Sequence, residues 1–290
     1  MKEIAIVSGK GGTGKTSVAA SLALVAGMEA VIADCDVDAA NMHLLLRPDF
    51  SEACDFYSGE IAVIDKGMCR VCGKCMEVCH FDAVTLTDSY AEISAINCEG
   101  CGYCSYVCGS SAITMVPAKT GVVYESNIRS GSKMVHATME PGAENSGKLV
   151  FNVRERAADI ARREQKGFTI IDGSPGIGCP VIASLSGVSL AVLVTEPSVA
   201  AIHDLLRIVE VIQQFRIRTL CVINKYDINR AKTNEIKLLL ANMNIAHVCD
   251  IAYDSDIAKA IAAGKAMSES GKRGSRAIAE LWSKIKAVYG

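Results

Sequence analysis

Apolar residues in this chain gather in short continuous runs that alternate with segments of helical periodicity. Runs of buried-strand length lie at Lys2–Ser8, Glu29–Asp34, Thr169–Asp172, Leu190–Thr195, Thr219–Ile223 and His247–Ile251. Helical spacing predicts helices at Lys15–Ala26, Val153–Gln165, Val199–Phe215, Arg230–Ala241 and Ala277–Val288. Strands that alternate with helices predict an α/β fold with a mostly parallel central sheet.

The alternation stops between residues 54 and 118, where cysteine and glycine are frequent. The pattern from Cys69 to Cys79 recurs 29 residues later from Cys98 to Cys108, which indicates an internal duplication. We therefore predict one α/β domain formed by residues 1–53 and 119–290, with a small inserted domain at 54–118. Residues 119–148 have no clear periodicity, and Glu140–Gly147 is predicted to be a loop.

Composition narrows the functional classes. The formal net charge is −2 and no long basic run is present, so nucleic acid is not an expected partner. No signal-peptide pattern and no apolar run of membrane-spanning length occur, so a cytoplasmic protein is expected. The apolar stripe of Ala277–Val288 is more typical of a core helix than of one that binds membranes. The odd number of cysteines, 13, indicates metal or redox chemistry rather than disulfides.

The segment Gly9–Thr16 has the Walker A pattern and lies between a predicted strand and a predicted helix. Glycines let the backbone wrap around phosphate oxygens, and the helix N-terminus favours negative charge. We expect Lys15 to neutralise the β- and γ-phosphates of a nucleotide and the Thr16 hydroxyl to bind Mg²⁺. The expected nucleotide-binding residues of this loop are Gly11, Gly12, Thr13, Gly14, Lys15, Thr16 and Ser17.

The additional lysine of this loop, Lys10, gives the pattern Lys-Gly-Gly-x-Gly-Lys-Thr. In this the chain resembles the deviant Walker A family of MinD, ParA and the nitrogenase iron protein. The resemblance implies a homodimer on ATP binding, in which Lys10 reaches the partner's nucleotide; a solvated loop lysine is the alternative. It also implies that an Asp after the second strand orients the attacking water. Asp36 matches best, with Asp34 and Asp38 as weaker candidates.

Two further segments follow apolar strands. Asp172 ends the run Ile170–Asp172 before a flexible turn, as a Walker B-like partner of Mg²⁺ does, and Gly176 in that turn is a candidate amide for the γ-phosphate. Asn224 begins Asn-Lys-x-Asp, the base-reading signature of GTPases. The resembled family uses a similar Asn to read adenine, so we favour ATP over GTP.

The two cysteine runs have the bacterial ferredoxin spacing, in which the fourth cysteine binds the other cluster. One [4Fe-4S] cluster is expected on Cys69, Cys72, Cys75 and Cys108, and a second on Cys98, Cys101, Cys104 and Cys79. The proline that usually follows each run is replaced by His80 and Gly109. Zinc is the alternative occupant, although zinc sites usually combine two separated cysteine pairs.

Taken whole, including Gly142–Gly147 and Pro175–Pro180, the chain resembles MinD-type P-loop ATPases with an inserted ferredoxin domain. The resemblance implies ATP, Mg²⁺ and two [4Fe-4S] clusters, and an ATPase that couples nucleotide state to electron transfer or to a redox partner protein. Two alternatives stay open. One is an iron–sulfur carrier similar to the Mrp group, which the absence of a Cys-x-x-Cys pair after Cys108 disfavours. The other is a positioning scaffold with structural clusters.

Overall fold

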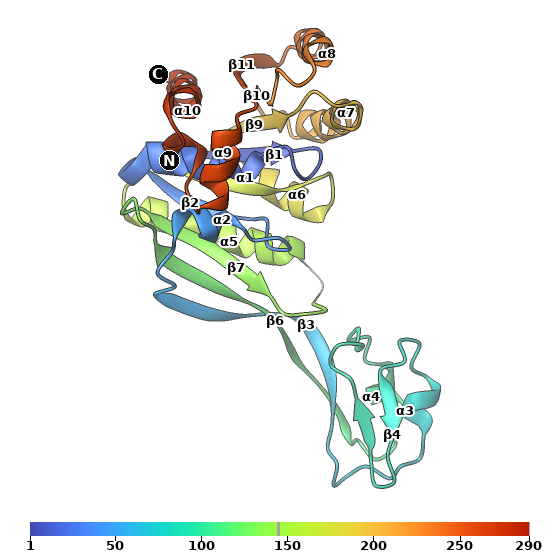
Figure 1. Ribbon diagram of the computed structural model, residues 1–290. Coiled ribbons are helices and arrows are strands. Elements are labelled where there is room, and N and C mark those ends of the chain that lie inside the picture. The colour runs from blue at the N-terminus through green and yellow to red at the C-terminus, as the bar shows by residue number, and fades with distance from the viewer. Residues whose placement is uncertain (144–145, 290) are drawn as a thin grey trace. The chain divides into compact units, whose positions relative to one another are not determined.

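The computed structural model describes residues 1–143 and 146–289 and divides into two compact units (Figure 1). The first unit contains Met1–Cys54, Val123–Thr138 and the chain from Ser146 onward. The second contains Asp55–Val122 and a short segment that begins at Met139. The cysteine-rich region therefore lies in the second unit, and the Walker A segment lies in the first.

The first unit is built on a mostly parallel sheet. Its strands run in the order β11 (Ala246–Ile251), β10 (Thr219–Asn224), β9 (Leu190–Thr195), β1 (Lys2–Ser8), β8 (Phe168–Pro175), β2 (Ala30–Asp34) and β7 (Lys133–Met139), and each neighbouring pair is parallel. Central β1 is covered on both faces, with Ile4–Val7 fully buried, which is why it reads as a continuous apolar run. The predicted α/β class with a mostly parallel sheet is confirmed.

Helices lie on both faces of this sheet (Figure 1). They are α1 (Lys15–Ala26), α2 (Met42–Leu46), α5 (Ser146–Arg163), α6 (Cys179–Leu185), α7 (Val199–Gln214), α8 (Arg230–Asn242), α9 (Ser255–Ala262) and α10 (Lys272–Ala287), with 3₁₀ turns η1 (Gly27–Glu29) and η2 (Met267–Glu269). Leu281 and Trp282 of α10 are buried in the core beside Leu22 of α1. The apolar stripe of α10 therefore faces the protein interior. Across the described residues, no helix combines the length and apolarity that crossing a membrane requires.

Residues 119–148 contain more regular structure than the sequence predicts. They include most of β6 (Ile113–Asn127) and all of β7, whose connecting backbone bonds, Ile128 to Ser132 and Glu140 to Thr120, define an antiparallel pair. Helix α5 begins at Ser146, so the loop predicted for Glu140–Gly147 is wrong at its last two residues, because the helix starts earlier than its apolar periodicity suggests. Glu144 and Asn145 of that segment lie outside the described residues.

The backbone conformation of the second unit is repeated within it, at an offset of 29 residues. It contains part of β3 (Glu52–Ile64), then α3 (Lys74–Glu77), β4 (Val84–Leu86), β5 (Ala91–Ile93), α4 (Tyr103–Tyr106) and the start of β6, and β4 pairs with β5 antiparallel. Positive φ angles recur at the same offset as the cysteines, in three matched pairs of positions: Val71 and Gly100, Gly73 and Gly102, Asp82 and Ser111. The duplication seen in the sequence is therefore also a duplication of local conformation.

Candidate nucleotide site and cysteine sites

The nucleotide-site candidates come together because parallel strands end at one edge of a sheet. The Walker A loop follows β1, Asp36 follows β2, Asp172 lies near the end of β8, and Asn224 ends β10. Gly12 and Gly14 have φ angles of 82° and 93°, conformations that favour glycine. Because the residue before α1 is Gly14, the first backbone N–H groups of the helix are left for a ligand such as phosphate.

Lys15 is the centre of a buried charge cluster. Its Nζ lies 2.7 Å from Asp172 Oδ1 and 3.2 Å from Asp36 Oδ2. Lys15 is 5% exposed and Asp172 is fully buried. Burial disfavours the ammonium ion, but Asp172 and Asp36 outweigh this effect, so the pKa of Lys15 is raised. One cation thus pairs with a carboxylate of β8 and with one that follows β2.

Two buried carboxylates of this cluster, those of Asp172 and Asp34, can each accept a further hydrogen bond or a metal ion. Burial is the main cause that raises the pKa of Asp172, and it raises the pKa of Asp34 to about 8. Within the described chain, Oδ2 of each has no hydrogen-bond partner. The Thr16 hydroxyl accepts a hydrogen bond from Lys15 Nζ at 3.3 Å and acts against the rise in the pKa of Asp172. A hydroxyl and an unsatisfied carboxylate oxygen at the end of a P-loop are the oxygen donors that Mg²⁺ prefers, so these residues fit the expected metal.

Lys10 is held by a residue that the sequence analysis missed. Its Nζ lies 2.7 Å from Glu196 Oε1, while Lys225 Nζ lies 2.9 Å from Glu196 Oε2 and donates to the Gly12 carbonyl at 3.2 Å. Burial raises the pKa of Glu196, but the two lysines more than offset it, so the net shift is downward. Its position directly after β9, at the same sheet edge, was the available signal.

Asn224 supports the loop directly. Its Nδ2 donates to the Thr13 carbonyl at 2.8 Å, and a Cβ added to Gly14 would lie 2.3 Å from that nitrogen. The side chain therefore lies against the phosphate loop, where a glycine is required. Asp227, the last residue of the GTPase-like signature, accepts the Tyr253 N–H at 2.7 Å and so connects two loops. Gly176, with φ of 93°, donates its N–H to the Ser8 carbonyl at 3.0 Å.

The eight spaced cysteines line two separate cavities in the second unit. One cavity is lined by Cys69, Cys72, Cys75 and Cys108, which we call cysteine site 1. The other is lined by Cys98, Cys101, Cys104 and Cys79, which we call cysteine site 2. In each, the fourth cysteine comes from the other run, as expected from the spacing. No group of three or more His, Cys, Asp or Glu side chains in the described residues is arranged to hold a single metal ion.

Backbone N–H groups point at several of these sulfurs. Ala91 of β5 donates to Cys69 Sγ at 3.4 Å, and Ala62 of β3 donates to Cys98 Sγ at 3.5 Å, a pair related by the duplication. Burial raises the pKa of the Cys75 and Cys104 thiols. Burial also acts to raise the pKa of Cys108, but hydrogen bonds from Ser110 and backbone amides bring it below its ordinary value. The unit therefore supplies donors that stabilise sulfur as thiolate.

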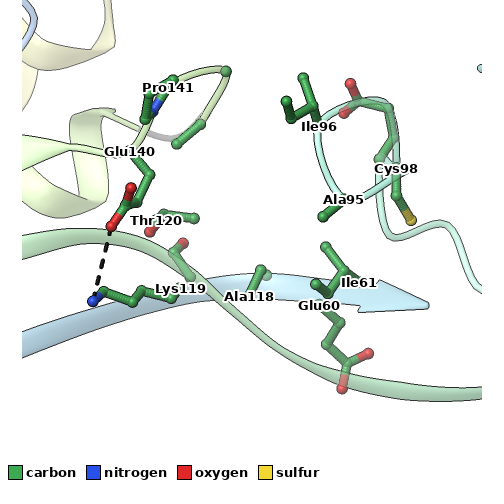
Figure 2. A pocket seen from close by; sticks show the side chains of 15 residues that line it. Glu60, Ile61, Ala95, Ile96, Cys98, Ala118, Lys119, Thr120, Glu140 and Pro141 are labelled. Atoms are coloured by element: carbon green, nitrogen blue, oxygen red, sulfur yellow. Dashed lines mark ion pairs between the residues drawn. The ribbon is translucent and has the colours of Figure 1, made fainter. Parts of the chain in front are cut away.

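A surface pocket of the second unit borders cysteine site 2. Glu60, Ile96, Cys98, Lys119 and Glu140 are among the residues that line it (Figure 2). Lys119 Nζ lies 3.8 Å from Glu140 Oε1, the pair drawn as a dashed line, and 2.7 Å from Asp55 Oδ1. One ligand candidate, Cys98, thus lines a pocket whose charged side chains are Glu60, Glu99, Glu140 and Lys119.

The sheet, the Walker A loop and the carboxylates at its edge define a P-loop nucleotide-binding protein of the α/β class. The model of the CobQ/CobB/MinD/ParA nucleotide-binding domain matches residues 4–267, and the chain belongs to this family. An uncharacterized protein of Methanocaldococcus jannaschii, MJ0578, is 36% identical over 98% of this chain and 96% of its own length.

Solved structures show the same fold. The septum site-determining protein MinD of Pyrococcus horikoshii, complexed with Mg-ADP, gives a TM-score of 0.60 at 17% identity, over 100% of this chain and 97% of that chain. The ATP complex of Cyanothece McdA gives a TM-score of 0.57 at 14% identity, over 98% of this chain and 95% of that chain. At these identities the likeness concerns the fold.

Proposed function

We propose that this protein is an ATPase that carries two [4Fe-4S] clusters and couples its nucleotide state to electron transfer or to redox-dependent partner binding. Membership of a family that includes the MinD/ParA-type ATPases supports the ATPase part. The observation that carries the cluster part is the grouping of eight cysteines into two cavities, each with its fourth cysteine from the other run.

In the nucleotide site, the residues of the chain have distinct tasks. Lys15 leaves its carboxylate partners and neutralises the β- and γ-phosphates, while the amides of Gly11–Ser17 bind phosphate oxygens. Asp172 and Thr16 would hold Mg²⁺, which would supply charge neutralisation at the phosphates. Asp36, no longer paired with Lys15, orients the attacking water. Its distance of 3.2 Å from Lys15 supports this role, because Lys15 is the residue expected to bind the β- and γ-phosphates.

We assign the second lysine to a homodimer. Lys10 is 29% exposed, and its Nζ lies 2.7 Å from Glu196 Oε1. Because this ion pair is partly solvated, breaking it costs little free energy. In a closed dimer, Lys10 exchanges Glu196 for the phosphates of the partner's nucleotide. Asn224 acts as the base contact, and because Asp227 accepts the Tyr253 amide, the Asp227 carboxylate is partly occupied, which supports ATP over GTP.

The second unit is the proposed electron carrier. The four thiolates of each site would hold a [4Fe-4S] cluster, which would supply one-electron chemistry. The N–H groups of Ala91 and Ala62 stabilise the negative charge on sulfur. The chain connects this unit to the nucleotide site, since Asp36 precedes α2, and β3 begins soon afterwards at Glu52. Ordering of the Asp36 segment by the γ-phosphate is a physical route by which nucleotide state reaches the second unit.

The test is an anaerobic preparation in which iron, sulfide and zinc are counted and EPR spectra are recorded with and without Mg-ATP. We expect about eight irons and eight sulfides per chain, and ATP-dependent change in the spectrum of the reduced protein. Zinc in both sites, or no metal after reconstitution, overturns the cluster assignment. Lys15→Ala is the matched control, since it should abolish ATP binding and leave the iron content unchanged.

The likeness to MinD and ParA-type structures favours one alternative function, a positioning scaffold in which the clusters are structural. The two functions differ in one measurement. If reduction of the clusters changes neither ATP turnover nor partner binding, the scaffold function is supported and redox coupling is refuted. A cluster carrier would transfer its clusters to an apo-protein acceptor, whereas the redox-coupled ATPase and the scaffold would not.

A further inference from the structure

The two cysteine sites are related by duplication, but their charged surroundings differ. The residues lining site 1 include two cations, Arg70 and Lys74, and within the described chain no anion lines that cavity. The residues lining site 2 include one anion, Glu99, and no cation. Glu99 occupies the position equivalent to Arg70 in the repeat, 29 residues later, and Tyr103 is equivalent to Lys74. The duplication has therefore kept the ligands and changed the charges.

Hydrogen bonds to sulfur differ in the same direction. At site 1, Cys69 accepts the Ala91 N–H at 3.4 Å, Cys108 accepts the Ala112 N–H at 3.3 Å, and the Ser110 hydroxyl lies 3.5 Å from Cys108 Sγ. At site 2, Cys98 accepts the Ala62 N–H at 3.5 Å. The repeat places Phe81, which has no donor, at the position of Ser110.

Both differences affect the energy of a reduced cluster. Reduction adds one negative charge to a cluster held by four thiolates, so nearby cations and sulfur hydrogen bonds favour the reduced state and nearby anions oppose it. The pocket next to site 2 is lined by Glu60, Glu99 and Glu140 and by Lys119, which pairs with Glu140, so its charged side chains carry a net negative charge. These charges lie at the surface, where solvent screens them, so each one changes the reduction equilibrium several-fold rather than by orders of magnitude.

We infer that the cluster of cysteine site 1 has the higher reduction potential, so that the first electron delivered to this unit resides there. The step is a one-electron transfer from a low-potential donor, in which the donor is oxidised and the site 1 cluster passes from the [4Fe-4S]²⁺ to the [4Fe-4S]⁺ state without a bond being formed or broken. Site 2, with its acidic border, is reduced second and serves as the lower-potential relay. This inference rests on the proposed function, because it requires both clusters.

The experiment is an EPR-monitored redox titration with dithionite on the anaerobic, full-length protein. Wild type is expected to show two separable one-electron steps. The variant Arg70→Gln with Lys74→Gln should lower the upper potential and leave the lower one unchanged. Glu99→Arg should raise the lower potential. For each variant we expect a change in the reduction equilibrium of about tenfold, equivalent to about 59 mV for one electron.

Asp88→Arg is the matched control, since Asp88 is exposed and lines neither cysteine cavity; it should change neither step. Iron and sulfide counts accompany every titration. About eight irons with a single shared potential, or a site 1 variant that moves the lower step, refutes the inference while the proposed function stands. A wild-type protein that holds no cluster refutes both. Arg70, Lys74 and Glu99 are exposed, and the iron count detects any variant that fails to fold.

Discussion

The sharpest expectation concerns the phosphate-loop lysine in the absence of nucleotide. Replacement of Lys15 by Met removes the cation that lies 2.7 Å from Asp172 and 3.2 Å from Asp36. Since Asp172 is fully buried, its charge is left without a countercharge or must be neutralised by a proton. Removing one partner of a buried pair costs about 3–5 kcal/mol, so we expect the nucleotide-free variant to lose about 3 kcal/mol or more of unfolding free energy.

The chain provides its own probe for this measurement. Trp282 is the single tryptophan, is 5% exposed, and packs against Phe168 with ring centroids 5.0 Å apart. Its fluorescence during urea unfolding therefore reports on the first unit. The control is Lys232→Met, which breaks a partly exposed pair with Glu235 on α8 and should cost at most about 0.5 kcal/mol.

The double variant Lys15→Met with Asp172→Asn tests the cause. If the loss comes from an unpaired buried charge, removing that charge should restore about 1–3 kcal/mol relative to Lys15→Met alone. The reasoning is refuted if Lys15→Met unfolds at the wild-type urea concentration, or if the double variant is no more stable than the single one. Saturating Mg-ATP should stabilise wild type, by about 2.7 kcal/mol at 100 times Kd, and leave Lys15→Met unchanged.

Three further outcomes are expected at Asp34, Lys10 and Cys72. Burial raises the pKa of Asp34 from its ordinary value of 3.8 to about 8, so between these pH values the folded state keeps a proton that the unfolded chain has lost. Stability should therefore fall as pH rises from about 4 to about 8, by at most about 1.4 kcal/mol per pH unit, and Asp34→Asn should remove that slope in Trp282-monitored unfolding. Lys10→Ala should change stability by less than about 1 kcal/mol, because its ion pair is partly solvated, and should lower ATP turnover more than tenfold in a phosphate-release assay; wild-type turnover would contradict its role across the dimer. Cys72→Ser should reduce iron from about eight to about four per chain without affecting ATP binding, and an unchanged iron count would exclude Cys72 as a ligand.

The central sheet could be predicted because buried parallel strands are continuous apolar runs. Lys2–Ser8 and Leu190–Thr195 have the same bounds in the structure as in the sequence analysis. β3 could not be found this way, since most of its side chains are exposed and give it no apolar run. β6 contains Pro117 and Gly121, residues that argue against a strand when read locally. Both strands are long, and they form because their backbones pair with neighbouring strands, which their composition does not reveal.

In the candidate site, too, local motifs could be predicted from the sequence and long-range contacts could not. The spacing of the Walker A loop and of the cysteine runs is local, so these motifs could be read from the sequence. The ion pair between Lys15 and Asp172 joins residues 157 positions apart, and the hydrogen bond from Asn224 to Thr13 joins residues 211 apart. Glu196 carries no motif at all. Such contacts depend on which strand ends share a sheet edge, and only the fold determines that.

The charge balance of the nucleotide site leads to a last expectation, on Mg²⁺. Lys15 pairs with both Asp36 and Asp172, so a triphosphate that binds Lys15 leaves those carboxylates facing further negative charge. Asp172 and Thr16 can accept a divalent cation, which restores the balance. ATP in EDTA should therefore bind at least about tenfold more weakly than Mg-ATP, and Asp172→Asn should shrink this difference by weakening Mg-ATP more than free ATP. Calorimetric titration of both ligands measures it, and equal affinities for ATP with and without Mg²⁺ would show that Lys15 is not shared between carboxylates and phosphate.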